Sequence, residues 1–310
     1  MPKFPTIPRL TIVVPHCGDT TSFESSLVSV LQHRPDACEV IVPHAGNYDD
    51  PFELGDEVNF VDAGTTSVIQ QIGEAAAVAR GRFVHVLADG HVAGQDWADQ
   101  ALLEFEHHDA GVVAPVVRHS DSNEIANAGW RQSAGSACEM AAAGTDAVKA
   151  GKGSRIDGGF LTTSFWRRDL LRSLTGSLRG SNDVVETSMA YCLLARQAGW
   201  RCVVSRDCNI RIGDSDSLLG DYQADVDANH RRLQAIADQF GTGGWGKSLG
   251  RFIATCLSYG VGSAIRRATA PMAQTAIAKA LRTNSALRCD EQVEAIRIPV
   301  SSNESYRRAA

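Results

Sequence analysis

Two residues whose side chains can bind metal ions or carry protons follow a short apolar run near residue 85. Residues 83–87, FVHVL, indicate a buried parallel strand, and Ala88-Asp89-Gly90-His91 forms the loop that leaves it. In open α/β sheets, ligands bind outside the carboxyl ends of the strands. We therefore expect Asp89 and His91 to lie close to the functional site.

The elements that must position this loop alternate between strands and helices. Apolar runs predict strands at 10–14, 40–42, 58–61, 83–87, 112–117 and 202–204, and helical spacing predicts helices near 23–33, 67–80, 96–105, 185–199 and 222–240. This alternation is typical of an α/β fold with a mostly parallel sheet and helices on both faces. Residues 119–158, rich in Ser, Gly, Ala and Asn, predict a long excursion over the functional edge of the sheet.

The same pattern predicts two parts of unequal size. Strand-like runs stop after residue 204, while helical spacing continues beyond it. We expect one α/β domain over about residues 9–212 and a basic, helical C-terminal extension over 213–310, whose end is disordered. A sheet strand supplied from beyond residue 245 would contradict this division.

Composition narrows the class of protein. A chain of 310 residues with 44% apolar content can bury one large core. The N-terminal sequence MPKFPTIPRL lacks the apolar core of a secretory signal, and no apolar run reaches the roughly 18 residues of a spanning helix. The eight cysteines form no CxxC pair, which favours reduced thiols in a cytoplasmic protein. The net charge of −6 gives no indication of a nucleic-acid partner.

The C-terminal part differs in charge from the rest. From residue 245 onward, ten Lys and Arg stand against four Asp and Glu, a net of +6, which leaves −12 for residues 1–244. Basic residues around a short apolar centre at 245–267 suit a helix lying on an anionic membrane. A helix packed on the acidic main domain is equally compatible, so both alternatives remain open.

One short motif indicates a different class of protein. Residues 241–248, GTGGWGKS, fit the pattern GxxxxGK[ST], in which backbone N–H groups cradle phosphates. A P-loop follows a buried strand, whereas this segment follows the predicted helix 222–240. We expect an exposed connector without a phosphate cradle and keep a P-loop NTPase as a less favoured alternative.

From about residue 9 to 212, the order and spacing of five segments resemble a family-2 glycosyltransferase of the GT-A fold, a Rossmann-like fold of nucleotide-diphospho-sugar transferases. The segments are TIVVPHCGD, EVIVPHAGNYDD, RGRFVHVLADGHVAGQDW, GGFLTTSFWRRDLL and ARQAGWRCVV. The resemblance implies transfer of a sugar, with inversion, from a nucleotide diphosphate donor to an acceptor that the sequence does not identify. It also implies a divalent metal ion, Mn²⁺ or Mg²⁺.

The chain departs from the family where the chemistry lies. His44 and Ala45 stand in place of two aspartates, and Ala88-Asp89-Gly90 stands in place of the family's metal-binding DxD. The family's Glu-Asp pair aligns with Thr187 and Ser188. A diphosphate leaving group needs its charge neutralised, and an acceptor hydroxyl needs a base. The alternative function is therefore a degenerate, non-catalytic domain that binds a sugar nucleotide or a protein partner.

The resemblance also assigns site residues. The nucleotide-sugar-binding candidates are Pro15, His16, His44, Asp89, Arg167 and Arg168. Glu186 and Asp183 are the candidate catalytic bases, although acids in the first turn of a helix also complement its dipole. Trp130 and Trp166 could stack on a base or a sugar, or pack in the core.

The histidines suggest a softer metal site. If the family's strand order holds, the loops that carry His16, His44 and His91 converge on the crevice that contains Asp89. Imidazole suits zinc, nickel or iron(II) better than magnesium. We therefore predict a metal site formed by Asp89, His91 and His44, with at least two of the three histidines near Asp89. The alternative is that they are unrelated loop residues.

Overall fold

The computed structural model describes residues 7–213, except 47, 49, 51–52, 134–136, 149–155 and 179–182, together with residues 236, 253, 256–257 and 262. The motif at 241–248 lies outside the described residues, as do most of 245–267 and most of the predicted extension. The division into two domains therefore stays a prediction. Among the described residues, no helix combines the length and the apolar character needed to cross a membrane.

The strands form one large mixed sheet and a small hairpin-like pair. They are β1 (Leu10–Val13), β2 (Cys38–His44), β3 (Val58–Asp62), β4 (Phe83–Val86), β5 (His91–Ala93), β6 (Ala110–His119), β7 (Ile125–Asn127), β8 (Trp130–Arg131), β9 (Glu139–Met140), β10 (Phe165–Arg167) and β11 (Arg201–Ile212). The nine-stranded sheet has the order β3-β2-β1-β4-β10-β6-β11-β5, with β7 paired to β6, while β8 pairs with β9. Each strand predicted from the sequence is present.

The direction of the strands changes across the sheet. Strands β3, β2, β1 and β4 run parallel, and so do β6 and β11. Strand β10 runs antiparallel to both of its neighbours, β4 and β6, and β5 runs antiparallel to β11. The sequence did not predict β5 or β10, because a run of three residues carries no periodicity.

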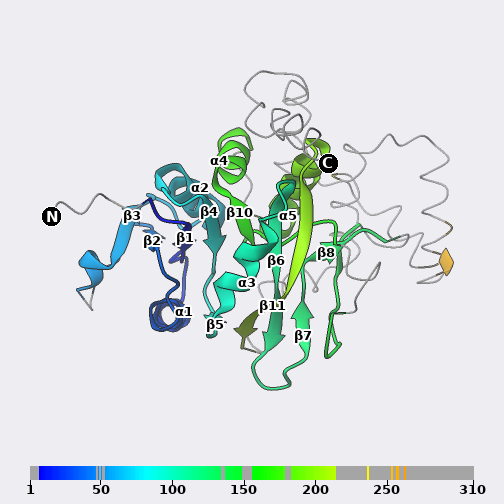
Figure 1. Ribbon diagram of the computed structural model, residues 1–310, viewed down its shortest axis with the longest axis horizontal. Helices are drawn as coiled ribbons and strands as arrows, with labels where there is room; N and C mark the ends of the chain where they lie inside the picture. Colours follow the sequence, from blue (N-terminus) through cyan, green and yellow to red (C-terminus); the bar gives the residue numbers. More distant parts are fainter. Residues whose placement is uncertain are drawn as a thin grey trace, which may run out of the picture.

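Helices cover both faces of the sheet, as predicted (Figure 1). They are α1 (Thr20–Gln32), α2 (Val68–Val78), α3 (Trp97–Glu104), α4 (Arg168–Ser177) and α5 (Val184–Gln197), with a 3-10 turn η1 (Leu54–Asp56) before β3. Side chains of α2, α4 and α5 share one hydrophobic cluster, and those of α1 and α3 share the other. The sheet is therefore buried on both sides, which is why its central strands are continuously apolar.

The central strand β4 shows how the sequence fills both faces. Val84 and Val86 belong to the cluster beneath α2, whereas Phe83 and Leu87 belong to the cluster beneath α1. His85 lies among the apolar side chains of the α1 face and is fully buried. Alternate residues of one strand thus enter two separate cores.

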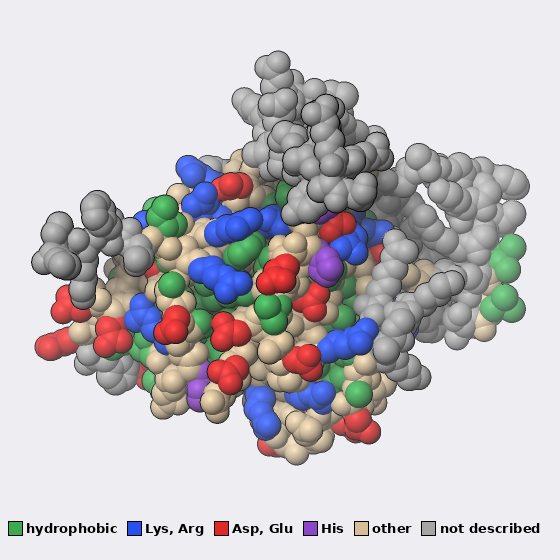
Figure 2. All heavy atoms as spheres, viewed as in Figure 1, with side chains coloured by type: hydrophobic (Ala, Val, Ile, Leu, Met, Phe, Trp, Pro, Cys, Tyr) green, Lys and Arg blue, Asp and Glu red, His purple; other side chains and the backbone are tan. Residues whose placement is uncertain are grey.

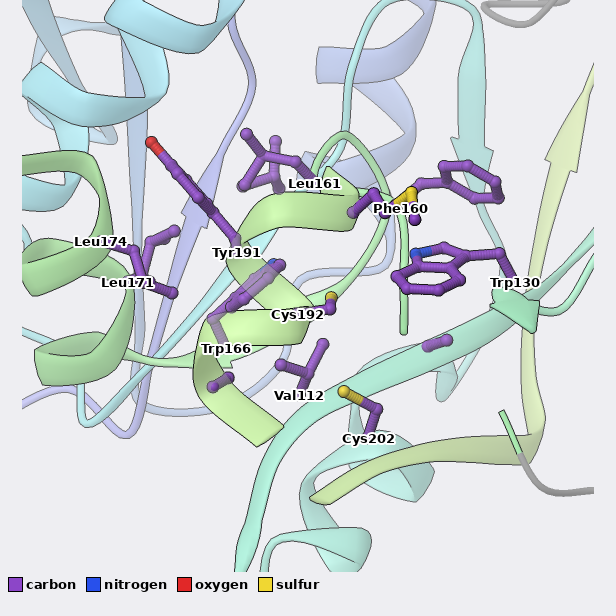
Figure 3. Packing of buried hydrophobic residues seen from close by; sticks show 14 of the residues in the cluster. Val112, Trp130, Phe160, Leu161, Trp166, Leu171, Leu174, Tyr191, Cys192 and Cys202 are labelled. Atoms are coloured by element: carbon purple, nitrogen blue, oxygen red, sulfur yellow. The ribbon is translucent and has the colours of Figure 1, made fainter. Parts of the chain in front are cut away.

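Two tryptophans that could have stacked on a ligand belong to the core. Trp130 and Trp166 are both 0% exposed. Figure 3 shows Trp166 beside Tyr191 of α5 and Trp130 beside Phe160, and the Trp166 and Tyr191 rings meet edge to face at 6.4 Å. Core packing, rather than ligand stacking, accounts for both residues.

Candidate functional site

The loops that follow β1, β2 and β4 meet at one edge of the sheet, which we call the carboxyl edge. Strand β1 pairs in parallel with β2 on one side and with β4 on the other. The predicted neighbourhood of these three strands is therefore confirmed. The excursion predicted at 119–158 also lies at this edge. Strand β10 is antiparallel to both β4 and β6, so β6 points in the same direction as β4 and ends at the carboxyl edge, where β10 begins.

A cavity of about 450 Å³ opens at the carboxyl edge between β1, β4 and the start of α2. Its described lining is Pro15, Cys17, Thr65, Thr66, Ser67, Val68, Gln70, Ala88 and Asp89. Of the predicted site residues, Pro15 and Asp89 lie in this lining. The volume is within the range of small-molecule sites, and hydroxyl groups outnumber charges among the lining residues.

The fully buried side chain of Gln71 holds two walls of the cavity together. Its Nε2 donates to the carbonyl oxygens of His16, at 2.9 Å, and Thr65, at 2.8 Å. Its Oε1 accepts from the Cys17 Sγ at 3.2 Å. Gln71 thus fixes the loop after β1 against the loop before α2. Gln71 was not among the predicted site residues, and the signal in the sequence was a polar side chain on the apolar face of an alanine-rich helix.

His16 and His44 pack around Tyr48 beside the cavity. The ring centroid of Tyr48 lies 5.1 Å from that of His16 and 6.4 Å from that of His44. Burial, and then the neighbouring His44, lowers the pKa of His16. The His44 Nδ1 accepts the backbone N–H of Gly46 at 3.1 Å. These two predicted nucleotide-binding residues therefore lie in an aromatic cluster that adjoins the cavity, and their role in binding stays a prediction.

The loop after β4 separates Asp89 from His91. Gly90 takes a left-handed conformation with φ of 78°, and its N–H donates to the carbonyl of Ser22 in α1 at 3.4 Å. This turn places the His91 ring inside the protein, where it is 2% exposed. Its Nδ1 is 3.2 Å from the carbonyl oxygen of Ala88 and 3.3 Å from that of Asp89. Asp89 lines the cavity, whereas the His91 Nδ1 is engaged by the backbone of its own loop.

The predicted metal site of Asp89, His91 and His44 is not assembled. Within the described part of the chain, no group of three or more His, Cys, Asp or Glu side chains is placed to hold a metal ion. The physical reasons are the burial of His91 and the packing of His44 on aromatic rings. At the two positions where the family carries carboxylates, Ala88 offers a methyl group and Gly90 no side chain. The residues present therefore do not fit a metal site of the DxD type.

Arg167 and Arg168 lie at the opposite end of the strands, which we call the amino edge. Because β10 is antiparallel, Arg167 pairs with Phe83 at the start of β4, far from the cavity. Its guanidinium donates to the carbonyl oxygens of Phe105, Ala110 and two histidines, His107 and His108. Arg168 donates to the Arg80 carbonyl and to Asp169. Both arginines therefore have structural partners at the amino edge, and their role in nucleotide binding stays a prediction.

The two candidate bases lie at the start of α5. Asp183 is the N-cap, and its Oδ1 accepts the N–H of Glu186 at 2.9 Å, so the structure gives it a helix-capping role. Glu186 is 3% exposed. The first turns of α5 are tied to the chain before β10, because Ser188 Oγ accepts the Leu161 N–H at 2.8 Å. The neighbouring Thr162 carbonyl accepts the N–H of Ala88 at 3.0 Å, which places this chain segment at the carboxyl edge.

Comparisons with known proteins identify the fold. No protein-family model matches the chain, and no curated protein sequence matches it. Among solved structures, it is similar to the mannosyltransferase PcManGT from Pyrobaculum calidifontis in complex with GDP-Man and Mn²⁺, with 15% identity over 96% of this chain and 88% of that one and a TM-score of 0.53. S. aureus TarS 1–349 matches with 16% identity over 97% and 92% and a TM-score of 0.52.

A third structure, GalNAc-T7 with UDP, GalNAc and Mn²⁺, matches with 11% identity and a TM-score of 0.50 over 76% of this chain and 53% of that one. At these identities the similarity shows the fold alone. The chain therefore has the GT-A fold, the fold of glycosyltransferases that use nucleotide sugars.

Proposed function

We propose that this protein is a glycosyltransferase that binds a nucleotide sugar in the cavity at the carboxyl edge. The observation that carries the proposal is the position of that cavity, which opens where the loops after β1 and β4 meet in a chain with the GT-A fold. Ligands of open α/β sheets bind at this edge. Gln71, which ties both walls together, gives the cavity a fixed shape before any ligand arrives.

Transfer of the sugar with inversion, as in family-2 enzymes, is the finer part of the proposal. It needs a base that takes the proton of the acceptor hydroxyl. Glu186 is our candidate, because Asp183 is engaged as the helix cap and Glu186 lies in the adjacent turn of α5. Glu186→Gln should abolish transfer while leaving donor affinity unchanged, whereas a structural role would lower the free energy of unfolding instead.

Binding without transfer is the second candidate function. It is favoured by the loss of carboxylates at Ala88 and Gly90, which leaves Asp89 as the one described acid in the lining of the cavity. A radiolabelled donor distinguishes the two functions, because transfer or slow hydrolysis releases the sugar and binding alone does not. A cytoplasmic location and membrane contact through 245–267 stay part of the proposal on sequence grounds.

The test is a screen of UDP and GDP sugars by thermal shift, followed by calorimetric titration of the compounds that raise the melting temperature. Thr66→Trp, an exposed position in the cavity lining, should block binding. Val78→Trp is the matched control, because it adds the same ring at an exposed position at the far end of α2, the helix that begins just after Thr66. Equal affinities of the two variants would show that the cavity is not the binding site.

A further inference from the structure

Arginines line the amino edge of the sheet on three adjacent segments of the chain. Arg9 precedes β1, Arg82 precedes β4, and Arg168 follows β10. Backbone hydrogen bonds fix this order, because the Phe83 N–H donates to the Arg9 carbonyl at 3.2 Å and the Arg168 N–H donates to the Arg82 carbonyl at 3.2 Å. Neighbouring strands lie about 5 Å apart. The three arginines therefore stand side by side at the ends of β1, β4 and β10.

Two further arginines extend this row onto the adjoining helices. Arg80 follows the end of α2, and its carbonyl accepts from Arg168 Nη1 at 3.1 Å. Arg172 lies one turn further along α4, which packs beside α2 (Figure 1). Four of the five arginines are exposed, and Arg168 is partly buried. We call these five arginines, together with the exposed side chains of Ile7 and Val78, the arginine surface.

Only part of the charge of the arginine surface is neutralised. Glu39 pairs with Arg80 at 2.8 Å, and Asp169 pairs with Arg168 at 2.9 Å. The other three arginines form no ion pair with the described residues, so five arginines against two carboxylates leave a net charge of +3. Like charges at facing positions of neighbouring strands destabilise a sheet. A sequence that breaks such a local rule is expected where the surface has a function.

Two apolar side chains are exposed next to these charges. Ile7, two residues before Arg9, is 82% exposed, and Val78, two residues before Arg80, is 47% exposed. Basic residues around exposed apolar side chains suit the interface of an anionic membrane, where the apolar groups leave water and the basic groups meet lipid phosphates. The phosphate backbone of a nucleic acid offers the apolar groups no such partner.

Charge also argues against other parts of the chain as the partner of this surface. Residues 1–6 contain one lysine and no acid, and the residues from 245 onward have a net charge of +6, so the arginines repel both. The acidic segment 214–227 follows β11, which ends at the carboxyl edge, the opposite edge of the sheet. An external anionic surface therefore fits the arginine surface better than the chain itself does.

We propose that the arginine surface binds an anionic membrane, with its arginines on the lipid phosphates and carboxylates and with Ile7 and Val78 in the interface. This contact is separate from the one predicted for 245–267, and it does not depend on the proposed function. The cavity opens at the other end of the strands, so a protein bound in this way keeps the cavity in the aqueous phase.

The experiment measures co-sedimentation of the full-length protein with vesicles. One set contains phosphatidylcholine alone, and in the other about a third of the lipid is phosphatidylserine. We expect binding to the second set only, and weaker binding at about 0.5 M than at about 0.1 M NaCl because salt screens the arginines. The double variant Arg9→Gln, Arg82→Gln should bind about 25-fold more weakly, or about fivefold for each arginine. Ile7→Ser should bind about fivefold more weakly through the lost apolar contact.

The double variant Arg206→Gln, Arg211→Gln is the matched control. It removes the same charge from two exposed positions of β11 that lie outside the arginine surface. Its binding to the phosphatidylserine vesicles should stay within about twofold of wild type. Urea denaturation of the Arg9 and Arg82 double variant should show a midpoint equal to or above that of wild type, because two repelling charges are removed. Lost vesicle binding is then not caused by unfolding.

Four results would overturn the inference. The first is an absence of binding to either set of vesicles. The second is an equal loss in both double variants, which would make overall charge the cause. The third is unchanged binding after loss of Arg9 and Arg82, which would place the membrane contact elsewhere, for example in 245–267. The fourth is binding of poly(U) RNA in place of vesicles, which would assign the arginines to a nucleic acid. None of these results affects the proposed function.

Discussion

The two edges of the sheet differ in the partners of their charged side chains. At the amino edge, the Glu39 carboxylate accepts from Thr11 Oγ1 at 2.6 Å, from Gly81 N–H at 3.1 Å and from the backbone and side chain of Arg80. Arg167 there donates only to carbonyl oxygens and lies over the rings of Phe83, Phe105 and Trp200. At the carboxyl edge, Asp89 and a run of hydroxyl groups line a cavity. Figure 2 shows acidic and basic side chains intermixed over the visible described surface, so charge alone marks neither edge.

This difference shows that the role of a charged residue follows from the groups that it contacts and not from its residue type alone. Burial raises the pKa of Glu39, but the hydrogen bonds from Thr11, Arg80 and Gly81 together lower it below its usual value. The Glu39 carboxylate therefore joins β1 and β2 to the residues just before β4, which is a structural role. The four substitutions below test this contrast, from the largest expected effect on stability to the smallest.

Glu39→Ala should have the largest effect on stability. It leaves the Thr11 hydroxyl and the Arg80 N–H without their acceptor and the Gly81 N–H with Thr11 Oγ1 alone, at a cost of about 3–5 kcal/mol in the free energy of unfolding. Urea denaturation measures this loss. Glu57→Ala is the control, because Glu57 is 62% exposed and pairs with Arg34 at 3.9 Å, so it should change stability by less than about 1 kcal/mol.

The pH dependence of the same variant follows from the lowered pKa of Glu39. Its contribution is present above the unfolded value of 4.5 and is lost as the pH falls through the lower folded value. Wild type should therefore lose stability relative to Glu39→Ala as the pH falls below about 4.5. Parallel stability curves over that interval would mean that Glu39 is not held as the structure shows.

Arg167→Ala tests whether Arg167 stabilises the amino edge or binds the donor. Loss of the hydrogen bonds to four carbonyl oxygens should reduce the free energy of unfolding by about 2–4 kcal/mol. The dissociation constant of the donor, measured well below the melting temperature, should stay unchanged because the cavity lies at the other edge. An affinity loss of about tenfold in folded protein would restore Arg167 to the binding site.

Gln71→Leu should separate affinity from stability at the carboxyl edge. The apolar side chain leaves the carbonyls of His16 and Thr65 without donors, for a loss of about 1–3 kcal/mol in stability, and it frees the two walls to move. Donor affinity should fall about tenfold by calorimetry. Thr175→Val, which removes a buried hydroxyl that bonds only within α4, is the control and should leave affinity unchanged.

His85→Phe should have the smallest effect at neutral pH. No described group forms a hydrogen bond with its ring nitrogens. The centroid of its ring lies 3.8 Å from that of Phe165 and 4.6 Å from that of Trp97. A phenyl ring of similar shape should therefore leave stability within about 1 kcal/mol of wild type, or raise it. His85 lies between the two edges, and its side chain has no described hydrogen-bond partner, in contrast to Glu39 and Arg167.

The same substitution should change the response to acid. Burial, and then the nearby His91, holds the pKa of His85 well below 6.5, so the unfolded chain binds a proton that the folded chain does not. Wild type should lose up to about 1.4 kcal/mol per pH unit below pH 6.5, and His85→Phe should lose less. His107→Phe, at an exposed position, should behave like wild type, and equal acid losses for all three proteins would contradict the prediction.

The sequence predicted the fold better than it predicted the site. Long apolar runs locate the strands because strands buried on both faces are apolar at consecutive positions, and periodic apolar residues locate the helices. The site depends on local turns. The left-handed Gly90 turns His91 inward, and the three-residue strand β10 carries Arg167 to the amino edge, and neither event leaves a periodic pattern. Gln71 was not predicted for a related reason. Its role depends on hydrogen bonds to the carbonyl oxygens of His16, which is far away in the sequence, and Thr65, which lies before its helix.

Strand β10 has a consequence for the order of folding. Strands β4 and β6 do not pair with each other, so this three-residue segment alone joins β3-β2-β1-β4 to β6-β11-β5. It can insert only after the chain from residue 120 to 164 has closed its loop, an entropic cost that grows with loop length. We therefore expect two half-sheets to form before the complete sheet, and Phe165 and Trp166, each buried on a different face, to join them in a late step.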